Sequence, residues 1–230
     1  MISSRKRFVF RMLANLLVEL VAVCIGIYIA LNLDDIGRAN EEEKSEITYL
    51  HSFVKNMNTD MEQLDELILY YENKTAALQY MIVLLDTTKE LNYKSLDSIH
   101  GPTLEPVTFF PTKGAYNSII SSGHLSIIQN NDIRIELSNL YERFMYRIEY
   151  NSKVVDDATF NYFAYLENKY DFKERTFRPL SSVEILNLNY KLNHLYLYNN
   201  FYYNRLIDAK QSVNRVLRLI TLELEGRDDD

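Results

Sequence analysis

The chain has 230 residues, of which 47% are hydrophobic and 25% are charged, and its formal net charge at pH 7 is −7. This length suits one sizeable domain or two small ones, and the apolar fraction is that of a folded protein, which excludes extensive disorder. The acidic balance, with no basic cluster beyond the first residues, excludes nucleic acid as the expected partner.

The first predicted element is a transmembrane helix over residues 12–33, which follows a basic tail over residues 1–11. From Met12 to Leu33 there is no Lys, Arg or Asp. About 22 helical residues at about 1.5 Å each match the hydrocarbon thickness of a bilayer, about 30 Å. The favourable transfer of the Leu, Ile and Val side chains outweighs the carboxyl group of Glu19, which costs about 3 kcal/mol near the centre of a bilayer.

A cleaved signal peptide is the competing interpretation, because it too is apolar and follows basic residues. Its apolar region is usually about 7–15 residues long. The run here is longer, and Tyr28 occupies the −3 position of the one plausible cleavage site. Basic residues precede the span and acidic residues follow it, which by the positive-inside rule predicts a cytoplasmic N-terminus with the remaining chain outside.

One face of the predicted span is unusual. At 100° per residue its polar and small residues share one stripe, while Cys24, the only cysteine, points the opposite way. Small residues at intervals of four let another helix approach closely, and polar side chains can hydrogen-bond across that contact. The stripe predicts a contact with a second copy or another membrane protein through Asn15, Glu19, Ala22, Gly26 and Ala30. Two alternatives stay open: Glu19 only snorkels towards water, or it belongs to a proton or ion pathway.

Residues 34–46 form an acidic juxtamembrane segment, and from Ile47 the apolar residues recur at alternating intervals of three and four. This spacing predicts an amphipathic helix of more than five heptads that reaches Leu85. Three further apolar residues flank the stripe: Phe53, Leu67 and Met81. They make it wider than the seam of a two-stranded coiled coil, which favours packing within a bundle of several helices.

Residues 87–115 interrupt the helical pattern, because they contain three of the four prolines. We expect a loop there, with one short helix near residues 93–99. A second short helix over residues 115–122 is predicted to stop at Gly123, since glycine readily takes the left-handed conformation that ends many helices.

Two long helices complete the predicted outer part. Asn131 is expected to cap a helix through residues 132–170 with its apolar residues on one face. A turn over residues 172–180 leads to the last helix, which opens with Ser181 and Glu184 at the spacing of a capping box.

No alternating run predicts a strand, so the expected fold class is all-α. It consists of one N-terminal transmembrane helix followed by a bundle of long amphipathic helices over residues 47–225. The acidic residues 226–230 are expected to fray.

The sequence contains no recognisable catalytic or metal-binding motif. Its four histidines lie on different predicted elements without metal-ligand spacing, and there is no glycine-rich phosphate loop. Carboxylates are plentiful, but on amphipathic helices they form solvated faces. We expect no enzyme activity, no metal and no cofactor, and the single cysteine leaves the outer part to be stabilised by packing alone.

Tyrosine is abundant, with 18 copies against no tryptophan, and several tyrosines crowd the stretch "NHLYLYNNFYYNR". Tyrosine can fill wide interhelical layers while its hydroxyl reaches the wet rim, which is the ordinary interpretation. The alternative is a groove for a glycan, a peptide or a partner protein, because Tyr beside Asn offers both stacking and hydrogen bonds. The residues predicted for this ligand or partner surface are Tyr196, Tyr198, Tyr202 and Tyr203.

Two stretches carry a resemblance to a known family: "VELVAVCIGIYIALNLDDI" and "FFPTKGAYNSIISSGHLSIIQNNDIRIELSNLY". The matching positions are Glu19, Gly26, Ala30 and Asn32 in the first and Tyr116, Gly123 and Asn131 in the second. The pattern resembles an uncharacterised family of small single-span membrane proteins of bacteria, most familiar from Bacteroidota. Here "NLDD" replaces the usual Asn-Trp exit, so the interfacial tryptophan is missing. The resemblance implies membrane anchoring and a helical external domain, and it implies no activity. With the orientation drawn from the charges, we expect an anchor in the bacterial inner membrane and a periplasmic domain.

Two functions therefore stay open. The first is a non-enzymatic envelope protein, in contact with membrane lipid, whose helical bundle acts as a scaffold or assembly component for an unknown partner. The second is a sensory or ligand-binding periplasmic module that signals through its transmembrane helix. Because only residues 1–11 are expected in the cytoplasm, such a signal would need a separate membrane partner to receive it.

Overall fold

The computed structural model describes residues 2–87, 91–105 and 107–228, with the side chains of residues 19–87, 91–101, 103–105 and 107–227. Two compact units divide the chain, Met1–Thr48 and Tyr49–Asp230. The described residues are almost entirely helical, which confirms the all-α fold class expected from the sequence.

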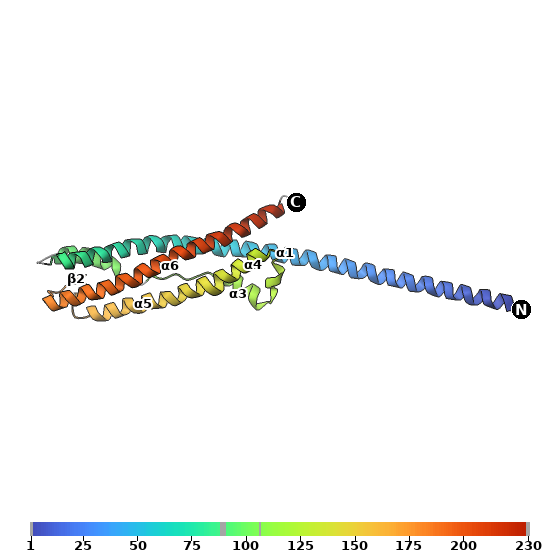
Figure 1. The fold of residues 1–230 in the computed structure, drawn as a ribbon, viewed down its shortest axis with the longest axis horizontal. Coiled ribbons are helices and arrows are strands. Elements are labelled where there is room, and N and C mark those ends of the chain that lie inside the picture. Colours follow the sequence, from blue (N-terminus) through green and yellow to red (C-terminus); the bar gives the residue numbers. More distant parts are fainter. Residues whose placement is uncertain (1, 88–90, 106, 229–230) are drawn as a thin grey trace. The chain divides into compact units, whose positions relative to one another are not determined.

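The first unit lies within helix α1, Ile2–Thr87, whose N-terminal end is blue in Figure 1. Within this unit the large apolar side chains from Leu20 to Ile36 are exposed. Among the described residues, α1 is the one helix that is long and apolar enough to cross a membrane.

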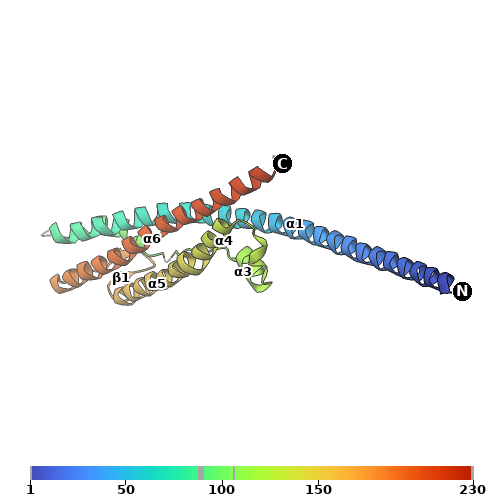
Figure 2. The same cartoon turned by 45° about the vertical axis from the view of Figure 1, so that its right-hand side comes forward.

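The second unit is a bundle of three long helical stretches that lie side by side in Figures 1 and 2. They are the part of α1 that follows Thr48, the run from α4 through α5 (Tyr146–Leu166), and α6 (Ser182–Asp228). The first two run in the same direction and α6 runs in the opposite one. The chain must therefore return along the bundle between α1 and α4, and it does so in an extended stretch.

The buried face of α1 follows a 3.5-residue repeat from Leu50 to Leu85. Its buried residues, Thr75 apart, alternate at intervals of three and four: Leu50, Phe53, Met57, Asp60, Leu64, Leu67, Tyr71, Lys74, Leu78, Met81 and Leu85. Phe53, Leu67 and Met81, which the sequence placed on a flank, are at the centre of this face. Two charged side chains, Asp60 and Lys74, share their position in the repeat.

The return from α1 to the next long helix contains several short elements. They are α2 (Tyr93–His100), the 3₁₀-helix η1 (Gly101–Thr103), the extended stretch, α3 (Gly114–Ser121) and the 3₁₀-helix η2 (His124–Ile127). The two short helices confirm the predictions for this region. Gly123 follows α3 with a φ of 72°, the left-handed conformation expected of it.

The long helix that follows is not regular. It consists of α4 (Asn131–Ser138), the π-helix η3 (Asn139–Met145) and α5. The π-helix was not predicted, and it places one extra residue in the pattern, so that two adjacent residues, Leu140 and Tyr141, are both buried.

The start of this helix differs from the prediction by one residue. Asn130, and not Asn131, is the cap, because its Oδ1 accepts hydrogen bonds from the N–H groups of Asp132 (3.0 Å) and Ile133 (3.3 Å). The side chain of Asn131 instead accepts a hydrogen bond from Arg134. Two consecutive asparagines offer the same capping chemistry, and the chain direction before the helix selects between them.

The turn before α6 contains a short antiparallel pair of strands, β1 (Tyr170–Asp171) and β2 (Thr176–Phe177). The expectation of no strand is corrected here, because two residues per strand are too few to show an alternating pattern. Asp171 shapes the turn, since its Oδ1 accepts hydrogen bonds from the N–H groups of Lys173 and Glu174, both at 3.0 Å.

The predicted capping box at the start of α6 is confirmed. The N–H of Ser181 donates to Oε2 of Glu184 (2.9 Å), and the N–H of Glu184 donates to Oγ of Ser181 (3.4 Å). The hydrogen bonds from Ser181 lower the pKa of the Glu184 carboxyl.

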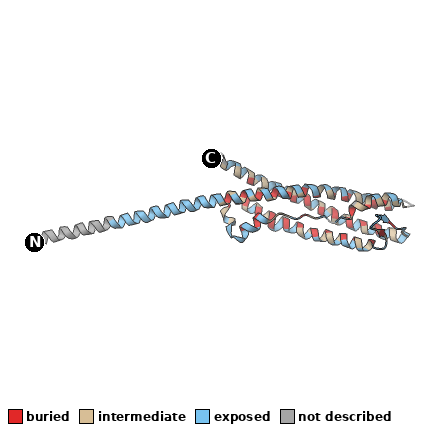
Figure 3. Ribbon diagram, turned by 180° about the vertical axis from the view of Figure 1, so that it is seen from behind, coloured by how far each residue is buried: buried red, intermediate tan, exposed pale blue. Residues whose placement is uncertain are grey.

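Two clusters of apolar side chains form the core of the bundle, and the buried residues in Figure 3 lie on the facing sides of its helices. The larger cluster joins α1, α3, α4, η3, α5 and α6. The smaller one joins the end of α1, α2, the strand pair and the first half of α6. Both clusters draw on elements far apart in the sequence, so packing between distant segments holds the bundle together.

Candidate functional site

The stripe predicted for a helix contact is exposed where the structure describes it. Glu19, Ala22, Gly26 and Ala30 are exposed, and a Cβ added to Gly26 would meet no atom within 4 Å. The side chain of Asn15 lies outside the described residues. Cys24 is exposed as well. The contact and its partner stay a prediction.

Tyr202 does not belong to a surface, so the predicted ligand or partner surface is wrong for this residue. The side chain is fully buried in the larger core cluster. Its hydroxyl accepts a hydrogen bond from the N–H of Phe109 (3.0 Å) and lies 2.8 Å from Oγ of Ser152. Its ring meets Tyr71 edge-on, with 5.0 Å between centroids. Tyr202 is thus a core residue that also satisfies buried polar groups.

The other three tyrosines of that prediction are partly buried. Tyr198 and Tyr203 pack against the larger core cluster, and Tyr196 packs against the smaller one. Consecutive side chains on a helix point about 100° apart, so tyrosines that are close in the sequence need not share a face. Binding of a ligand or partner by these three tyrosines stays a prediction.

His100 is buried in the smaller core cluster among aromatic rings. Its Nε2 lies 2.8 Å from the hydroxyl of Tyr162, and its ring packs against Tyr170 and Phe177 at centroid distances of 4.5 and 4.6 Å. This burial lowers the pKa of His100 to about 3, so the imidazole is neutral at physiological pH. No group of three or more His, Cys, Asp and Glu side chains in the described part of the chain could hold a metal ion.

The extended stretch between η1 and α3, described for residues 104–105 and 107–113, is held by polar side chains of α1. Tyr70 and Lys74 donate hydrogen bonds to the carbonyl of Glu105, at 2.6 and 2.9 Å, and Tyr71 donates to the carbonyl of Val107 at 2.8 Å. These three hydrogen bonds satisfy two backbone carbonyl groups in the first half of the stretch.

Two N–H groups in the other half of the stretch donate to α1 as well. The N–H of Phe110 donates to Oε1 of Gln63 (2.9 Å), and the N–H of Thr112 donates to Oδ1 of Asp60 (2.8 Å). An extended segment outside a sheet leaves its backbone groups unpaired, and each buried unpaired group costs about 1–3 kcal/mol. We call these contacts the α1 clamp, and they explain the charged residues at buried positions of the repeat.

Lys74 is the cationic residue of the clamp, and its pKa is shifted. Burial lowers its pKa to about 8, while the carboxyl groups of Asp156 and Glu105 oppose this shift. Its ammonium group also lies 5.4 Å from the ring centre of Tyr70. The amine is engaged with backbone and rings, which indicates a structural role.

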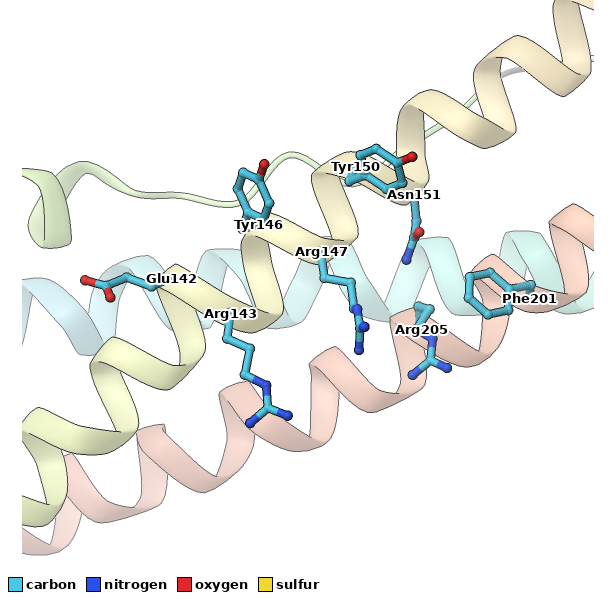
Figure 4. A pocket seen from close by; sticks show the side chains of 8 residues that line it. All are labelled: Glu142, Arg143, Tyr146, Arg147, Tyr150, Asn151, Phe201 and Arg205. Atoms are coloured by element: carbon cyan, nitrogen blue, oxygen red, sulfur yellow. The ribbon is translucent and has the colours of Figure 1, made fainter.

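A groove between α6 and the η3–α5 segment gathers three arginines, and Figure 4 shows it from close by. We call it the arginine groove. It encloses about 570 Å³. Its lining residues are Glu142, Arg143, Tyr146, Arg147, Tyr150, Asn151, Phe201 and Arg205.

The basic side chains of the groove converge from two segments of the chain. Arg143, Arg147 and Asn151 extend towards α6, and Arg205 and Phe201 come from α6 itself (Figure 4). The guanidinium group of Arg205 lies 4.9 Å from the ring centre of Phe201. The same three arginines line an adjoining smaller hollow, so they form one continuous basic surface.

Few acidic groups balance these arginines. Arg205 donates to Oδ2 of Asp208 at 2.8 Å, whereas Arg143 and Arg147 form no ion pair with any described residue. Glu142 points away from the three guanidinium groups in Figure 4 and accepts a hydrogen bond from the hydroxyl of Tyr116 at 2.6 Å. In a chain of net charge −7, this is a local excess of positive charge.

Two polar atoms of the groove residues lack hydrogen-bond partners. Nε of Arg205 and Nδ2 of Asn151 are both buried and unpaired. Both atoms are shielded from solvent, as are six further unpaired side-chain atoms elsewhere in the described chain, so a ligand in the groove does not reach them as the side chains stand.

The groove was missed by sequence reasoning. The one available signal was the pair Arg143 and Arg147, two like charges four residues apart on a helix, which is an unfavourable spacing unless a partner compensates it. The approach of Arg205 could not be read from the sequence, because it depends on how α6 packs on α5.

A family model matches residues 19–187 of the chain. The chain belongs to DUF6090, a family of unknown function. The resemblance to an uncharacterised family is thereby confirmed, and the match brings no activity with it. The range that matches DUF6090 includes Arg143, Arg147 and Asn151 but ends before Phe201 and Arg205. No curated protein and no solved structure gives a match.

Proposed function

We propose that this DUF6090 protein is a non-enzymatic, single-pass membrane protein whose helical bundle acts as an assembly scaffold in the cell envelope. One observation carries the proposal. Ten large apolar side chains of α1 between Leu20 and Ile36 are 49% to 69% exposed, on all sides of the helix. A helix that is apolar all round needs lipid or protein around it.

The charges that flank this segment support an orientation. Four basic residues precede it, Arg5, Lys6, Arg7 and Arg11, and acidic residues begin at Asp34. The positive-inside rule then places the N-terminus in the cytoplasm and the bundle outside. In a bacterium with two membranes, the bundle would be periplasmic and the anchor would lie in the inner membrane.

An exposed apolar face on α6 supports the scaffold role. Val183, Leu186, Tyr190 and Leu197 share this face at helical spacing and are 63% to 71% exposed. We call it the α6 face. Between residues 182 and 204 the only Asp, Glu, Lys or Arg residues are Glu184 and Lys191, so the segment is neutral. Tyrosine enrichment and few charges are typical of interface cores.

The occupant that we propose for the α6 face is a second copy of the chain. A neutral face can meet its own copy about a two-fold axis without charge repulsion. The remainder of the chain is acidic, and its copies would repel one another elsewhere. The predicted contact stripe of the transmembrane segment would then act in the same dimer.

Membrane fractionation of the full chain tests the anchor. We expect the protein in the membrane pellet after washing with alkaline carbonate, and we expect detergent to release it. A periplasm-active reporter fused after residue 225 should be functional. Recovery in the soluble fraction would contradict the anchor, and cytoplasmic reporter activity would contradict the orientation.

Copurification tests the scaffold. Two differently tagged copies expressed together should copurify in mild detergent, and the substitution Leu186→Lys should weaken the capture. Failure of the tagged copies to associate would contradict the dimer. A stable enzymatic activity of the pure protein would contradict the non-enzymatic role.

A further inference from the structure

We propose that the arginine groove binds an organic phosphate, which presents a dianionic phosphate group to the three guanidinium groups and an organic part to Phe201. This site shares no residue with the anchor or the α6 face, and Phe201 follows Leu197 by one helical turn on α6. Its ligand class follows from the charge and the size of the groove.

The charge of the groove favours a dianion over a monoanion. Arg143, Arg147 and Arg205 line it, and Asp208 pairs with only one of them. Two guanidinium groups are left without a carboxylate. A phosphate monoester carries a charge of about −1.5 to −2 at pH 7, whereas a carboxylate carries one negative charge. Planar guanidinium groups also match the oxygens of a phosphate in pairs.

The size of the groove favours an organic phosphate over inorganic phosphate. Its volume of about 570 Å³ lies within the usual range of small-molecule sites, about 300–1,000 Å³. A phosphate ion alone would leave most of this space to water. Phe201, 47% exposed, supplies an apolar wall for the organic part.

The π-helix η3 explains why these residues face the groove. From α4 into the start of η3 the buried residues are Ile133, Leu137 and Leu140, and the same intervals continued would bury Arg147 and Asn151. The extra residue of η3 shifts the pattern, so Met145 and Ile148 are buried instead. The basic side chain and the amide are thereby turned out of the core, and π-helices are frequent at functional sites for such reasons.

Calorimetry on the full chain in a maltoside detergent, which has no phosphate head group, tests the site. The probes are phenyl phosphate, inorganic phosphate and benzoate. We expect one phenyl phosphate per chain, with weaker binding of inorganic phosphate and benzoate. Absence of phenyl phosphate binding, or benzoate binding of equal strength, would overturn the proposal.

A matched pair of double variants locates the binding. R143Q/R147Q should weaken phenyl phosphate binding by at least about tenfold, since charge-assisted hydrogen bonds contribute about 1.5–3 kcal/mol each and 1.4 kcal/mol is tenfold. R215Q/R218Q removes the same charge from another place on α6 and should change the affinity less than about twofold. Equal losses in both variants would mean general attraction by charge and would overturn the site.

A third variant should raise the affinity for phenyl phosphate, and a variant that merely unfolds would lower it. Asp208→Asn removes the carboxylate that competes for Arg205 and should tighten phenyl phosphate binding several-fold. Weaker binding in this variant would contradict the assignment of Arg205 to the site. Circular dichroism should show the same helix content in all variants.

Nanodiscs distinguish two sources of the phosphate. The full chain is placed in discs of phosphatidylcholine alone or with phosphatidic acid, whose head group is a phosphate monoester. Loss of phenyl phosphate binding only in discs with phosphatidic acid supports the site with a membrane lipid as its ligand. Equal binding in both discs supports the site with a soluble phosphate as its ligand.

Discussion

The α1 clamp and the arginine groove both concentrate polar and charged side chains, and they differ in whether those groups have partners within the chain. Asp60 and Lys74 are almost fully buried, and each hydrogen-bonds to the extended stretch, although Oδ2 of Asp60 is itself buried without a partner. Arg143 and Arg147 are exposed and form no ion pair with a described residue. Burial of a charged group therefore indicates a structural role when the backbone satisfies it. An excess of like charge without partners in the chain supports the anionic ligand that we propose for the groove.

The largest expected effect is on the clamp. Asp60→Ala removes the acceptor for the N–H of Thr112 and should lower the free energy of unfolding by about 2–3 kcal/mol, because a buried donor is left unpaired. Chemical unfolding of the full chain in detergent, followed by circular dichroism, measures this. Glu66→Ala, an exposed site on the same helix, is the control and should change stability little. An equal effect of both substitutions would remove the distinction between clamp and surface.

The clamp should also give stability a pH dependence through Lys74. Its pKa in the folded chain is about 8, below the ordinary value of 10.5. A lowered pKa means that the stability contributed by the neutral amine is full above pH 10.5 and is lost as the pH falls through 8. Between pH 7.5 and 9.5 the stability of the wild type should rise by about 2 kcal/mol relative to Lys74→Met.

The comparison between wild type and variant matters here, because buried tyrosines titrate at higher pH and affect both proteins alike. Burial raises the pKa of Tyr70 to about 12. A difference between the two proteins that stays constant from pH 7.5 to 9.5 would mean that Lys74 keeps an ordinary pKa.

The next effect concerns the α6 face, which lacks partners as the groove does but is apolar. Leu186→Lys should weaken self-association about tenfold, or about 1.4 kcal/mol, because it places a charge in a neutral contact. The unfolding of the single chain should stay unchanged, since Leu186 is 71% exposed. Analytical ultracentrifugation in density-matched detergent measures the association. Loss of folding together with loss of association would show that the face belongs to the core.

The smallest effect is on the stability of the groove itself. R143Q/R147Q removes two like charges one turn apart and should stabilise the fold by about 0.3 kcal/mol at low salt. This corresponds to a rise in melting temperature of about 1 °C. Thermal unfolding without ligand measures it. A fall of several degrees would mean that these arginines hold the bundle together, as Asp60 and Lys74 do.

Local chemistry explains which features could be predicted from the sequence. The capping box of Ser181 and Glu184 and the left-handed Gly123 depend on neighbouring residues, and the structure confirms both. The long helices follow from apolar residues at intervals of three and four. The all-α fold class is therefore a property of the sequence pattern itself, and so is the apolar segment before residue 34.

Tertiary packing decided the rest, because it sets which side of each helix faces the core. Tyr202 is buried, whereas Tyr203, its neighbour in the sequence, is only partly buried. Both residues are tyrosine, so the residue type alone does not predict which of them enters the core. The burial of Asp60 and Lys74 depends on their hydrogen bonds to the extended stretch, and no sequence pattern places that stretch beside α1. The arginine groove likewise depends on two features of the tertiary structure. The π-helix η3 rotates the following residues of α5 relative to the core, and α6 packs so that Arg205 lies beside Arg143 and Arg147. A sequence pattern fixes the period of a helix, whereas its phase and its neighbours are set by contacts between segments distant along the chain.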